Sequence, residues 1–416
     1  MSCLRYCEQD LYIENVSLAE IAREYGTPCY VYSRAAILNN LHSYQHAFAN
    51  IPHLICYAVK ANSNLAILKL LADAGSGFDI VSIGELTRVI AAGGLPKQVI
   101  FSGVGKSSEE IQEAMRLGIF CFNVESEPEL ERIAAIAKMH HKTVDIMLRV
   151  NPDIDAKTHS YISTGLRENK FGMNLGDLIP LFNKIQALTS LRLIGVGAHI
   201  GSQITELQPF MLALDHLLAI YTTLKEQGIT LHYINIGGGL GITYRDEMPP
   251  SISEYAAALC RRLADYPVKL ILEPGRSIVG NAGVLLAKIE YLKDNGTRHF
   301  AITDTGMNDL VRPALYNAWQ DILPVRLHKH PLQQYDITGP VCESADFLGK
   351  NRELSLAPGE YLAIDSAGAY GFCMSSNYNS RNRPAEVLVN GERTHLIRRR
   401  ETIEDLMSLE YVVQES

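Results

Sequence analysis

The chain has 416 residues, of which 47% are hydrophobic and 20% charged, and its formal net charge at pH 7 is −8. This composition is that of an ordinary globular protein and excludes a disordered, collagenous or disulfide-stapled chain, while the length predicts two or three domains. The acidic balance and the lack of a long basic segment argue against a nucleic-acid or anionic-membrane partner.

The sequence carries no pattern typical of secretion, membrane insertion or metal binding. The eight cysteines form no CxxC pair, no apolar run is long enough to cross a bilayer, and the first ten residues lack the apolar stretch of a secretion signal. We therefore expect a cytoplasmic protein with reduced thiols. We expect no metal site, because no His/Cys cluster has the spacing of metal ligands.

Short apolar runs alternate with amphipathic segments from about residue 54 to residue 275. Ser107 and Ser126 are each followed three residues later by glutamate, a spacing typical of a helix start. Eight strand–helix units in about 220 residues favour an α/β fold with a (β/α)8 TIM-type barrel over an open sheet. The predicted strands are 54–60, 77–82, 98–103, 120–124, 143–150, 191–200, 231–236 and 268–273.

The pattern changes after about residue 280, where short alternating runs replace the helical periodicity and predict a β-rich C-terminal domain. Asn390-Gly391 separates two of these runs and predicts a hairpin with a type I′ turn, which needs positive φ angles. We expect the barrel to span residues 30–278. The β-rich domain should span residues 279–416, joined by residues 1–29. The predicted strands of this domain are 298–303, 335–341, 360–365 and 385–389.

Residues with reactive or unusual side chains follow the predicted barrel strands, at the end of the barrel where active sites form. Lys60 ends the first strand, where partial desolvation favours a neutral, nucleophilic amine. A triple glycine, 237–239, follows the seventh strand, near the position where barrels commonly bind phosphate. Alone, the lysine would more often be a solvated side chain and the glycines a tight turn, and only the whole set of residues indicates a cofactor site.

Two further residues complete this set. Glu273 ends the eighth predicted strand, and His199 offers a flat ring at the end of the sixth. A nucleophilic lysine, a phosphate loop, a ring that can stack and a carboxylate indicate pyridoxal 5′-phosphate (PLP) as the cofactor. Lys60 would bind the cofactor covalently, and Glu273 would pair with its ring nitrogen.

The chain resembles the diaminopimelate decarboxylase family, whose members depend on PLP and have an alanine-racemase-like barrel. The resemblance covers nearly the whole chain, and its motifs occur in one order, which makes it more specific than any single motif. The motifs lie at 57–62, 78–82, 170–172, 199–203, 235–239, 273–277, 307–309, 312–316, 342–346 and 368–371.

This resemblance implies roles in cofactor binding. Lys60 would carry PLP, His199 would stack on its ring, and Glu273 would meet the ring nitrogen. Residues that would contact the rest of the cofactor are Asp79, Ser202, Gly237, Gly238, Gly239, Gly275, Arg276 and Tyr370.

The resemblance also implies the substrate, meso-2,6-diaminopimelate, which loses CO2 at its D centre to give L-lysine in the last step of lysine biosynthesis. Arginine suits the retained carboxylate, and Glu343 suits the distal ammonium. Cys342 is the candidate acid that returns a proton to Cα, although most single cysteines are inert thiols. The substrate-binding set would be Arg276, Arg312, Tyr316, Glu343 and Tyr370.

The family forms a head-to-tail homodimer in which the partner subunit supplies the cysteine and glutamate that correspond to Cys342 and Glu343. We therefore expect this chain to form a homodimer with shared active sites.

Three alternatives stay open at this point. A decarboxylase of ornithine, arginine or carboxynorspermidine would share the barrel, but its substrate lacks the second amino-acid end that Arg312 and Glu343 suit. A racemase on this barrel would carry arginine in place of Glu273. A PLP-binding regulator without catalysis would be expected to lose Lys60, Glu273 or Cys342, and all three are present.

Overall fold

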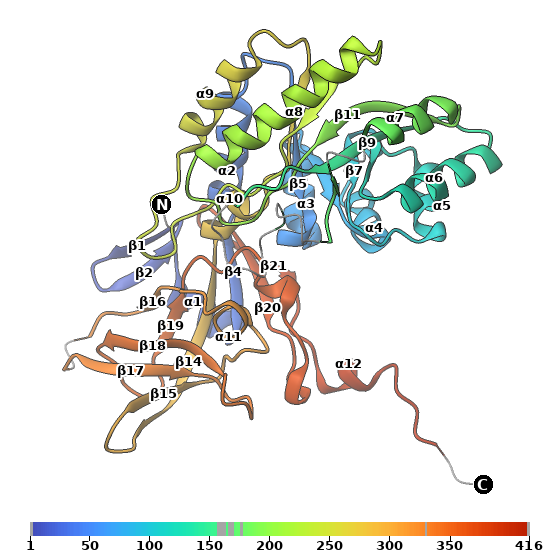
Figure 1. Cartoon of the computed structure of the whole chain (residues 1–416). Helices are drawn as coiled ribbons and strands as arrows, with labels where there is room; N and C mark the ends of the chain where they lie inside the picture. Colours follow the sequence, from blue (N-terminus) through green and yellow to red (C-terminus); the bar gives the residue numbers. More distant parts are fainter. Residues whose placement is uncertain (1–2, 156–163, 165–169, 175–177, 329–330, 414–416) are drawn as a thin grey trace. The chain divides into compact units, whose positions relative to one another are not determined.

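The computed structural model describes residues 3–155, 164, 170–174, 178–328 and 331–413 (Figure 1). The chain divides into two compact units. The barrel unit comprises residues 38–243 and 247–278, and the β-rich unit comprises residues 1–37, 244–246 and 279–416. Within the described ranges, no helix combines the length and apolar character that crossing a membrane requires.

Eight parallel strands form a closed barrel, because β13 pairs with β5 and β8 pairs with β9. The predicted barrel is therefore confirmed, with a strand at each expected place. A short additional strand, β10 (Met173–Asn174), pairs with β9. The barrel strands are β5 (His53–Ala58), β6 (Gly77–Ile80), β7 (Val99–Phe101), β8 (Cys121–Val124), β9 (Val144–Asn151), β11 (Leu191–Gly197), β12 (Tyr233–Asn235) and β13 (Lys269–Leu272).

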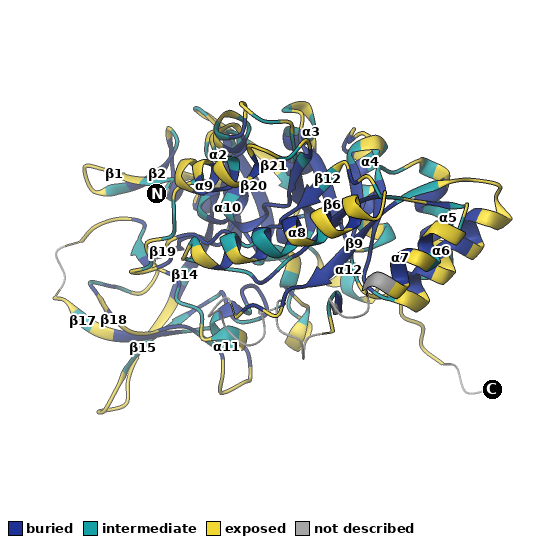
Figure 2. Ribbon diagram, turned by 45° about the horizontal axis from the view of Figure 1, so that its top comes forward, coloured by how far each residue is buried: buried dark blue, intermediate teal, exposed yellow. Residues whose placement is uncertain are grey.

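Helices separate these strands along the chain, and Figure 2 shows the strands as the buried inner part, with the outer faces of the helices exposed. Ser107 begins α5 in the predicted capping box with Glu110. Ser126 begins α6 by accepting a hydrogen bond from the Glu129 amide. The helices are α2 (Arg34–Ala47), α3 (Leu65–Asp73), α4 (Ile83–Ala91), α5 (Ser108–Leu117), α6 (Glu127–Met139), α7 (Leu178–Ala187), α8 (Gln208–Glu226), α9 (Ile252–Leu263) and α10 (Arg276–Val279).

The β-rich unit contains a large sheet in which strands from both ends of the chain lie side by side (Figure 1). The N-terminal strand β4 pairs antiparallel with β14 and parallel with β20. The start of the chain thus contributes a strand to the sheet of the β-rich unit. This pairing also groups residues 30–37, expected in the barrel, with the β-rich unit.

The sheet order is β18-β17-β15-β14-β4-β20-β21, and β19 also pairs with β14 and β16. A separate three-stranded sheet of β1, β2 and β3 precedes α1. The elements of this unit are β1 (Leu4–Cys7), β2 (Asp10–Ile13), β3 (Val16–Ser17), α1 (Leu18–Tyr25), β4 (Cys29–Ser33), β14 (Gly283–Asp294), β15 (His299–Thr303), α11 (Arg312–Tyr316), β16 (Ile322–Pro324), β17 (Gln333–Thr338), β18 (Phe347–Leu354), β19 (Tyr361–Ile364), β20 (Ala385–Asn390), β21 (Arg393–Arg398) and α12 (Ile403–Met407).

The hairpin predicted at Asn390-Gly391 is present, but the predicted turn type is wrong. Asn390 pairs with Arg393, so the loop consists of Gly391 and Glu392. Gly391 has a positive φ of +64°, whereas Glu392, which the structure also describes, does not have a positive φ. A positive φ at the first loop residue alone fits a type II′ turn, whereas type I′ needs it at both.

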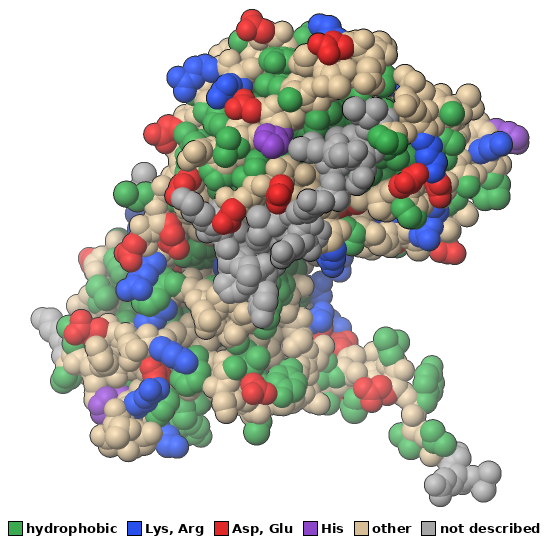
Figure 3. Space-filling model, in the orientation of Figure 1, with side chains coloured by type: hydrophobic (Ala, Val, Ile, Leu, Met, Phe, Trp, Pro, Cys, Tyr) green, Lys and Arg blue, Asp and Glu red, His purple; other side chains and the backbone are tan. Residues whose placement is uncertain are grey.

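On the face that Figure 3 shows, both Lys or Arg and Asp or Glu side chains are exposed. The absence of nucleic-acid and membrane partners stays a prediction from the sequence.

Candidate active site

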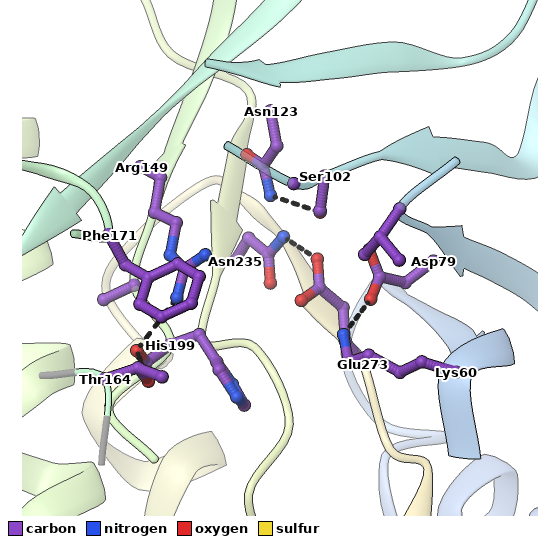
Figure 4. A pocket seen from close by; sticks show the side chains of 13 residues that line it. Lys60, Asp79, Ser102, Asn123, Arg149, Thr164, Phe171, His199, Asn235 and Glu273 are labelled. Carbon is purple, nitrogen blue, oxygen red and sulfur yellow. Dashed lines mark hydrogen bonds and ion pairs between the residues drawn. The ribbon is translucent and has the colours of Figure 1, made fainter. Parts of the chain in front are cut away.

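A cavity of about 170 Å³ lies at the carboxyl ends of the barrel strands (Figure 4). All eight strands contribute to its lining, either through a residue of the strand or through one that follows it within a few positions. The lining residues are Lys60, Asp79, Val81, Ser102, Gly103, Asn123, Arg149, Thr164, Phe171, Ala198, His199, Asn235 and Glu273.

Lys60 reaches the cavity from a 3-10 turn, η1 (Val59–Ala61), and not from the strand on which it was predicted, because β5 ends at Ala58. Its Nζ atom donates a hydrogen bond to Oδ2 of Asp79 over 2.8 Å. The Lys60 side chain is 37% exposed, whereas that of Asp79 is fully buried. Among the described residues, Oδ1 of Asp79 has no hydrogen-bond partner. The amine is therefore accessible and lies beside a carboxylate that can accept a further hydrogen bond.

Glu273 follows β13 and is only 7% exposed. Its Oε1 atom accepts a hydrogen bond from Nδ2 of Asn235 over 2.6 Å. Burial raises the pKa of Glu273 to about 7, and the nearby Asp79 carboxylate adds to the rise while Lys60 opposes it. A cation beside Glu273 would stabilise its charged form, as the protonated nitrogen of a pyridine ring would do.

His199 follows β11 and presents a neutral ring to the cavity. Desolvation lowers its pKa well below the usual value, and the charges of Arg149 and Lys60 act in the same direction. Its Nδ1 atom accepts a hydrogen bond from the Gly238 amide over 3.2 Å, so the proton of the neutral ring lies on Nε2. Its carbonyl oxygen accepts a hydrogen bond from the Thr164 hydroxyl over 2.7 Å.

The triple glycine packs closely against neighbouring strands. The Gly237 amide donates to Oδ1 of Asn235 over 2.8 Å, and the Gly238 amide donates to His199. A Cβ atom on Gly238 would lie 2.2 Å from the carbonyl oxygen of Glu273, which explains the need for glycine there. The Gly239 amide has no hydrogen-bond partner among the described residues. The predicted phosphate role of the glycine run therefore rests mainly on Gly239, because the other two amides are already hydrogen-bonded.

Ser202 and Arg276 form a second part of the predicted phosphate site. The Nη2 atom of Arg276 donates a hydrogen bond to the Ser202 hydroxyl over 3.0 Å, and Arg276 is 6% exposed. A Cβ atom on Gly275 would lie 3.0 Å from the Cβ of Ala61, so this glycine allows close packing against the turn that carries Lys60. A buried guanidinium beside a hydroxyl suits an anion.

The other predicted site residues belong to the β-rich unit. Arg312 and Tyr316 lie on α11, and buried Arg312 donates to the Tyr244 hydroxyl over 2.9 Å. Tyr370 has a left-handed φ of +56°. The exposed residues Cys342 and Glu343 lie between β17 and β18.

The structure adds residues to which the sequence assigned no role. Asn235 lies within the 235–239 motif and contacts both Glu273 and the glycine run. Arg149 ends the fifth predicted strand, and it forms a buried ion pair of 2.9 Å with Glu125. Asn235 could have been inferred from its sequence, because an asparagine at a strand end often accepts a hydrogen bond from the amide two residues later. The Arg149–Glu125 pair joins β9 to the residue that follows β8, and it has no such local signal.

The chain matches known proteins over its full length. Residues 34–280 match the pyridoxal binding domain of the pyridoxal-dependent decarboxylases. Diaminopimelate decarboxylase from Haemophilus influenzae is 54% identical over 415 residues, which cover 99% of this chain and 100% of that protein.

Solved structures agree with the sequence matches. Diaminopimelate decarboxylase from Helicobacter pylori, complexed with L-lysine, has 42% identity and a TM-score of 0.91, covering 94% of this chain and 98% of that one. The enzyme from M. jannaschii, in co-complex with L-lysine, has 37% identity and a TM-score of 0.94, covering 99% and 98%. The fold, the cavity and these similarities agree, and the chain belongs to the diaminopimelate decarboxylase family of the pyridoxal-dependent decarboxylases.

Proposed function

We propose that this chain uses PLP to decarboxylate meso-2,6-diaminopimelate to L-lysine and CO2, the last step of lysine biosynthesis. The observation that carries the proposal is the cavity at the barrel end, where the Lys60 amine, two buried carboxyl groups and the neutral His199 ring meet (Figure 4). Full-length relatives named diaminopimelate decarboxylase support the substrate.

The residues of the cavity fit PLP. An accessible amine can bind its aldehyde, and the desolvated Glu273 carboxyl gains a cationic partner in the ring nitrogen. His199 offers an uncharged flat surface on which a ring can stack. Ser202, Gly239 and Arg276 provide hydroxyl, amide and guanidinium donors suited to a phosphate.

When bound, PLP supplies an electron-accepting ring that stabilises the charge left on Cα after CO2 departs. In our proposal Lys60 binds the cofactor, and Glu273 holds a proton at the ring nitrogen and so keeps the ring electron-poor. His199 keeps the ring in place and excludes water from one face. Asp79 orients the Lys60 amine through the 2.8 Å hydrogen bond.

The proposed substrate contacts are Arg276 of the barrel unit and several residues of the β-rich unit. Arg276 and Arg312 would bind carboxylate groups, Tyr316 and Tyr370 would contact the substrate, and Glu343 would bind the distal ammonium. The Cys342 thiol would donate the proton that Cα takes up. We propose that the active form is a homodimer in which the partner subunit supplies the cysteine and glutamate, so each site is completed by a second copy. A cytoplasmic location also stays a proposal.

The decisive measurement is CO2 release from meso-diaminopimelate, set beside ornithine and arginine at equal concentration. We expect turnover of diaminopimelate only, with L-lysine as the product. Faster turnover of ornithine or arginine would contradict the proposed substrate.

A second experiment tests the role of Lys60. Lys60→Ala should remove both the absorbance of bound PLP and the activity. A variant that keeps full turnover would exclude Lys60 as the cofactor lysine.

A further inference from the structure

We propose that Asn235 is a positioning residue for Glu273: its amide holds one carboxylate oxygen, so that the ionised carboxylate keeps its other oxygen for the cofactor's ring nitrogen. This inference rests on the function proposed above and adds a residue to it.

Asn235 connects Glu273 to the glycine run that follows β12. Its Nδ2 atom donates to Oε1 of Glu273 over 2.6 Å, and its Oδ1 atom accepts from the Gly237 amide over 2.8 Å. The Gly237 carbonyl in turn accepts a hydrogen bond from the Glu273 amide over 2.7 Å. Three hydrogen bonds therefore link Asn235, Gly237 and Glu273 in a closed set. Asn235 is 1% exposed, so water does not compete for these contacts.

The charge around Glu273 explains why a neutral donor is needed at this position. Buried Asp79 lies near Glu273 and disfavours a second negative charge, whereas Lys60 is hydrogen-bonded to Asp79. The Asn235 amide favours the ionised form of Glu273, because it donates to the carboxylate without bringing a charge that would compete with the cofactor. Figure 4 shows the Asn235 amide directed at the Glu273 carboxylate.

A second buried asparagine of the barrel, Asn151, provides a control for Asn235. Asn151, at the end of β9, accepts a hydrogen bond from the amide two residues later, that of Asp153, over 3.0 Å. Its Nδ2 atom donates to the carbonyl oxygen of Phe171 over 3.2 Å. Asn151 thus shares the local turn of Asn235 and lacks its contact with Glu273.

The test is a double-mutant cycle in the PLP-loaded full-length enzyme. Asn235→Asp keeps the shape and the acceptor for Gly237, but it replaces the donor with a second carboxyl group. We expect kcat for CO2 release to fall by about 10-fold or more, the size of a lost charge-assisted hydrogen bond, while KM changes by less than about 2-fold. In the Glu273→Gln background, the same change should lower kcat by less than about 2-fold, because the group on which it acts is absent.

The absorbance of bound PLP provides a readout that needs no substrate. Asn235→Asp should make the absorbance and the activity depend on pH across the neutral range, because two adjacent carboxyl groups share one proton and lose it as the pH rises. The matched variant Asn151→Asp should leave the pH dependence of the absorbance as in the wild type. Asn235→Leu serves as a second variant that removes both contacts.

Independent losses of kcat in the two backgrounds, or an Asn235→Asp enzyme with wild-type kcat and absorbance, would overturn the positioning role while the proposed function stood. A wild-type protein that binds PLP but releases no CO2 from diaminopimelate would instead refute the proposed function, and the absorbance would still decide the role of Asn235.

Discussion

Asp309 carries one of the carboxyl groups that the fold removes from water. It is 1% exposed, and it accepts hydrogen bonds from the Gly306 amide over 3.0 Å and from Asn308 over 3.1 Å. Burial raises the pKa of Asp309 to about 7, because these contacts do not replace the lost hydration. The folded protein therefore binds this proton more tightly than the unfolded chain does.

The raised pKa of Asp309 determines how the free energy of unfolding changes with pH. The stability contributed by protonated Asp309 is fully present below its unfolded pKa, near 3.8, and is lost as the pH rises through about 7. We expect Asp309→Asn to make the fall in unfolding free energy between about pH 4 and about pH 8 shallower, by on the order of 1 kcal/mol or more. Thermal unfolding across this range checks it. Asp215→Asn, in a surface ion pair with Arg262, is the control and should leave the slope unchanged.

At the same scale, we expect Cys342→Ala to leave PLP bound but to slow turnover by about 100-fold, the usual effect of removing a general acid. Cofactor absorbance and CO2 release together measure the two effects. Cys7→Ala, which removes another exposed cysteine, should keep wild-type turnover. Unchanged turnover in Cys342→Ala would remove the thiol from the mechanism.

At the level of the elements, the glycine run after β12 packs tightly against the residue that follows β13. Gly238 leaves no room for a side chain, because a Cβ atom would lie 2.2 Å from the Glu273 carbonyl oxygen. Its φ is not positive, so packing rather than backbone conformation requires glycine here. Any side chain at this position must move Glu273, the residue proposed to pair with the ring nitrogen of the cofactor.

Gly238→Ala should therefore weaken PLP binding by about 10-fold or more, as expected when a buried contact is overpacked. Titration of the PLP-free protein with PLP, followed by absorbance, measures the change. Gly105→Ala is the matched control in another loop of the barrel, because a Cβ atom there meets nothing within 4 Å. Equal PLP affinity in both variants would show that the backbone at Glu273 can move without weakening PLP binding.

Sequence periodicity predicted the barrel elements well, because a buried parallel strand is a short apolar run that needs no distant information. The carboxyl ends were less predictable. The apolar run through Val59 continues past Ala58, where hydrogen bonding to β6 stops and η1 begins. The chemical identity of the site could be inferred from motifs, but the contact of Asn235 with Glu273 and that of Arg149 with Glu125 could not. They depend on how neighbouring strands are aligned.

The strands of the β-rich unit were harder to predict, because they too depend on pairing between distant segments. The 12-residue strand β14 had not been predicted, since its last residues are exposed and charged, and two of its pairing partners, β4 and β19, lie far away in the sequence. The turn after β20 was assigned to the wrong type because register, and not composition, decides which two residues form the loop.

For the whole molecule, the proposed sharing of sites between subunits gives a distinct prediction. Lys60→Ala and Cys342→Ala should each be inactive or nearly so as separate homodimers. After denaturation and refolding as an equal mixture, half of the dimers should pair the two variants, and one of their two sites carries both wild-type residues. We expect recovery of about a quarter of wild-type activity. No recovery, with mixed dimers demonstrated, would place both residues of a site in one subunit.

The position of β4 in the middle of its sheet has a consequence for biosynthesis. This strand leaves the ribosome early, yet its two neighbours, β14 and β20, follow the entire barrel and end at Asp294 and Asn390. During translation the nascent chain must keep an apolar strand unpaired while the barrel is being made. A chaperone that binds exposed strands would therefore find this N-terminal segment available while the barrel is synthesised, and β4 gains its second neighbour only when β20 emerges.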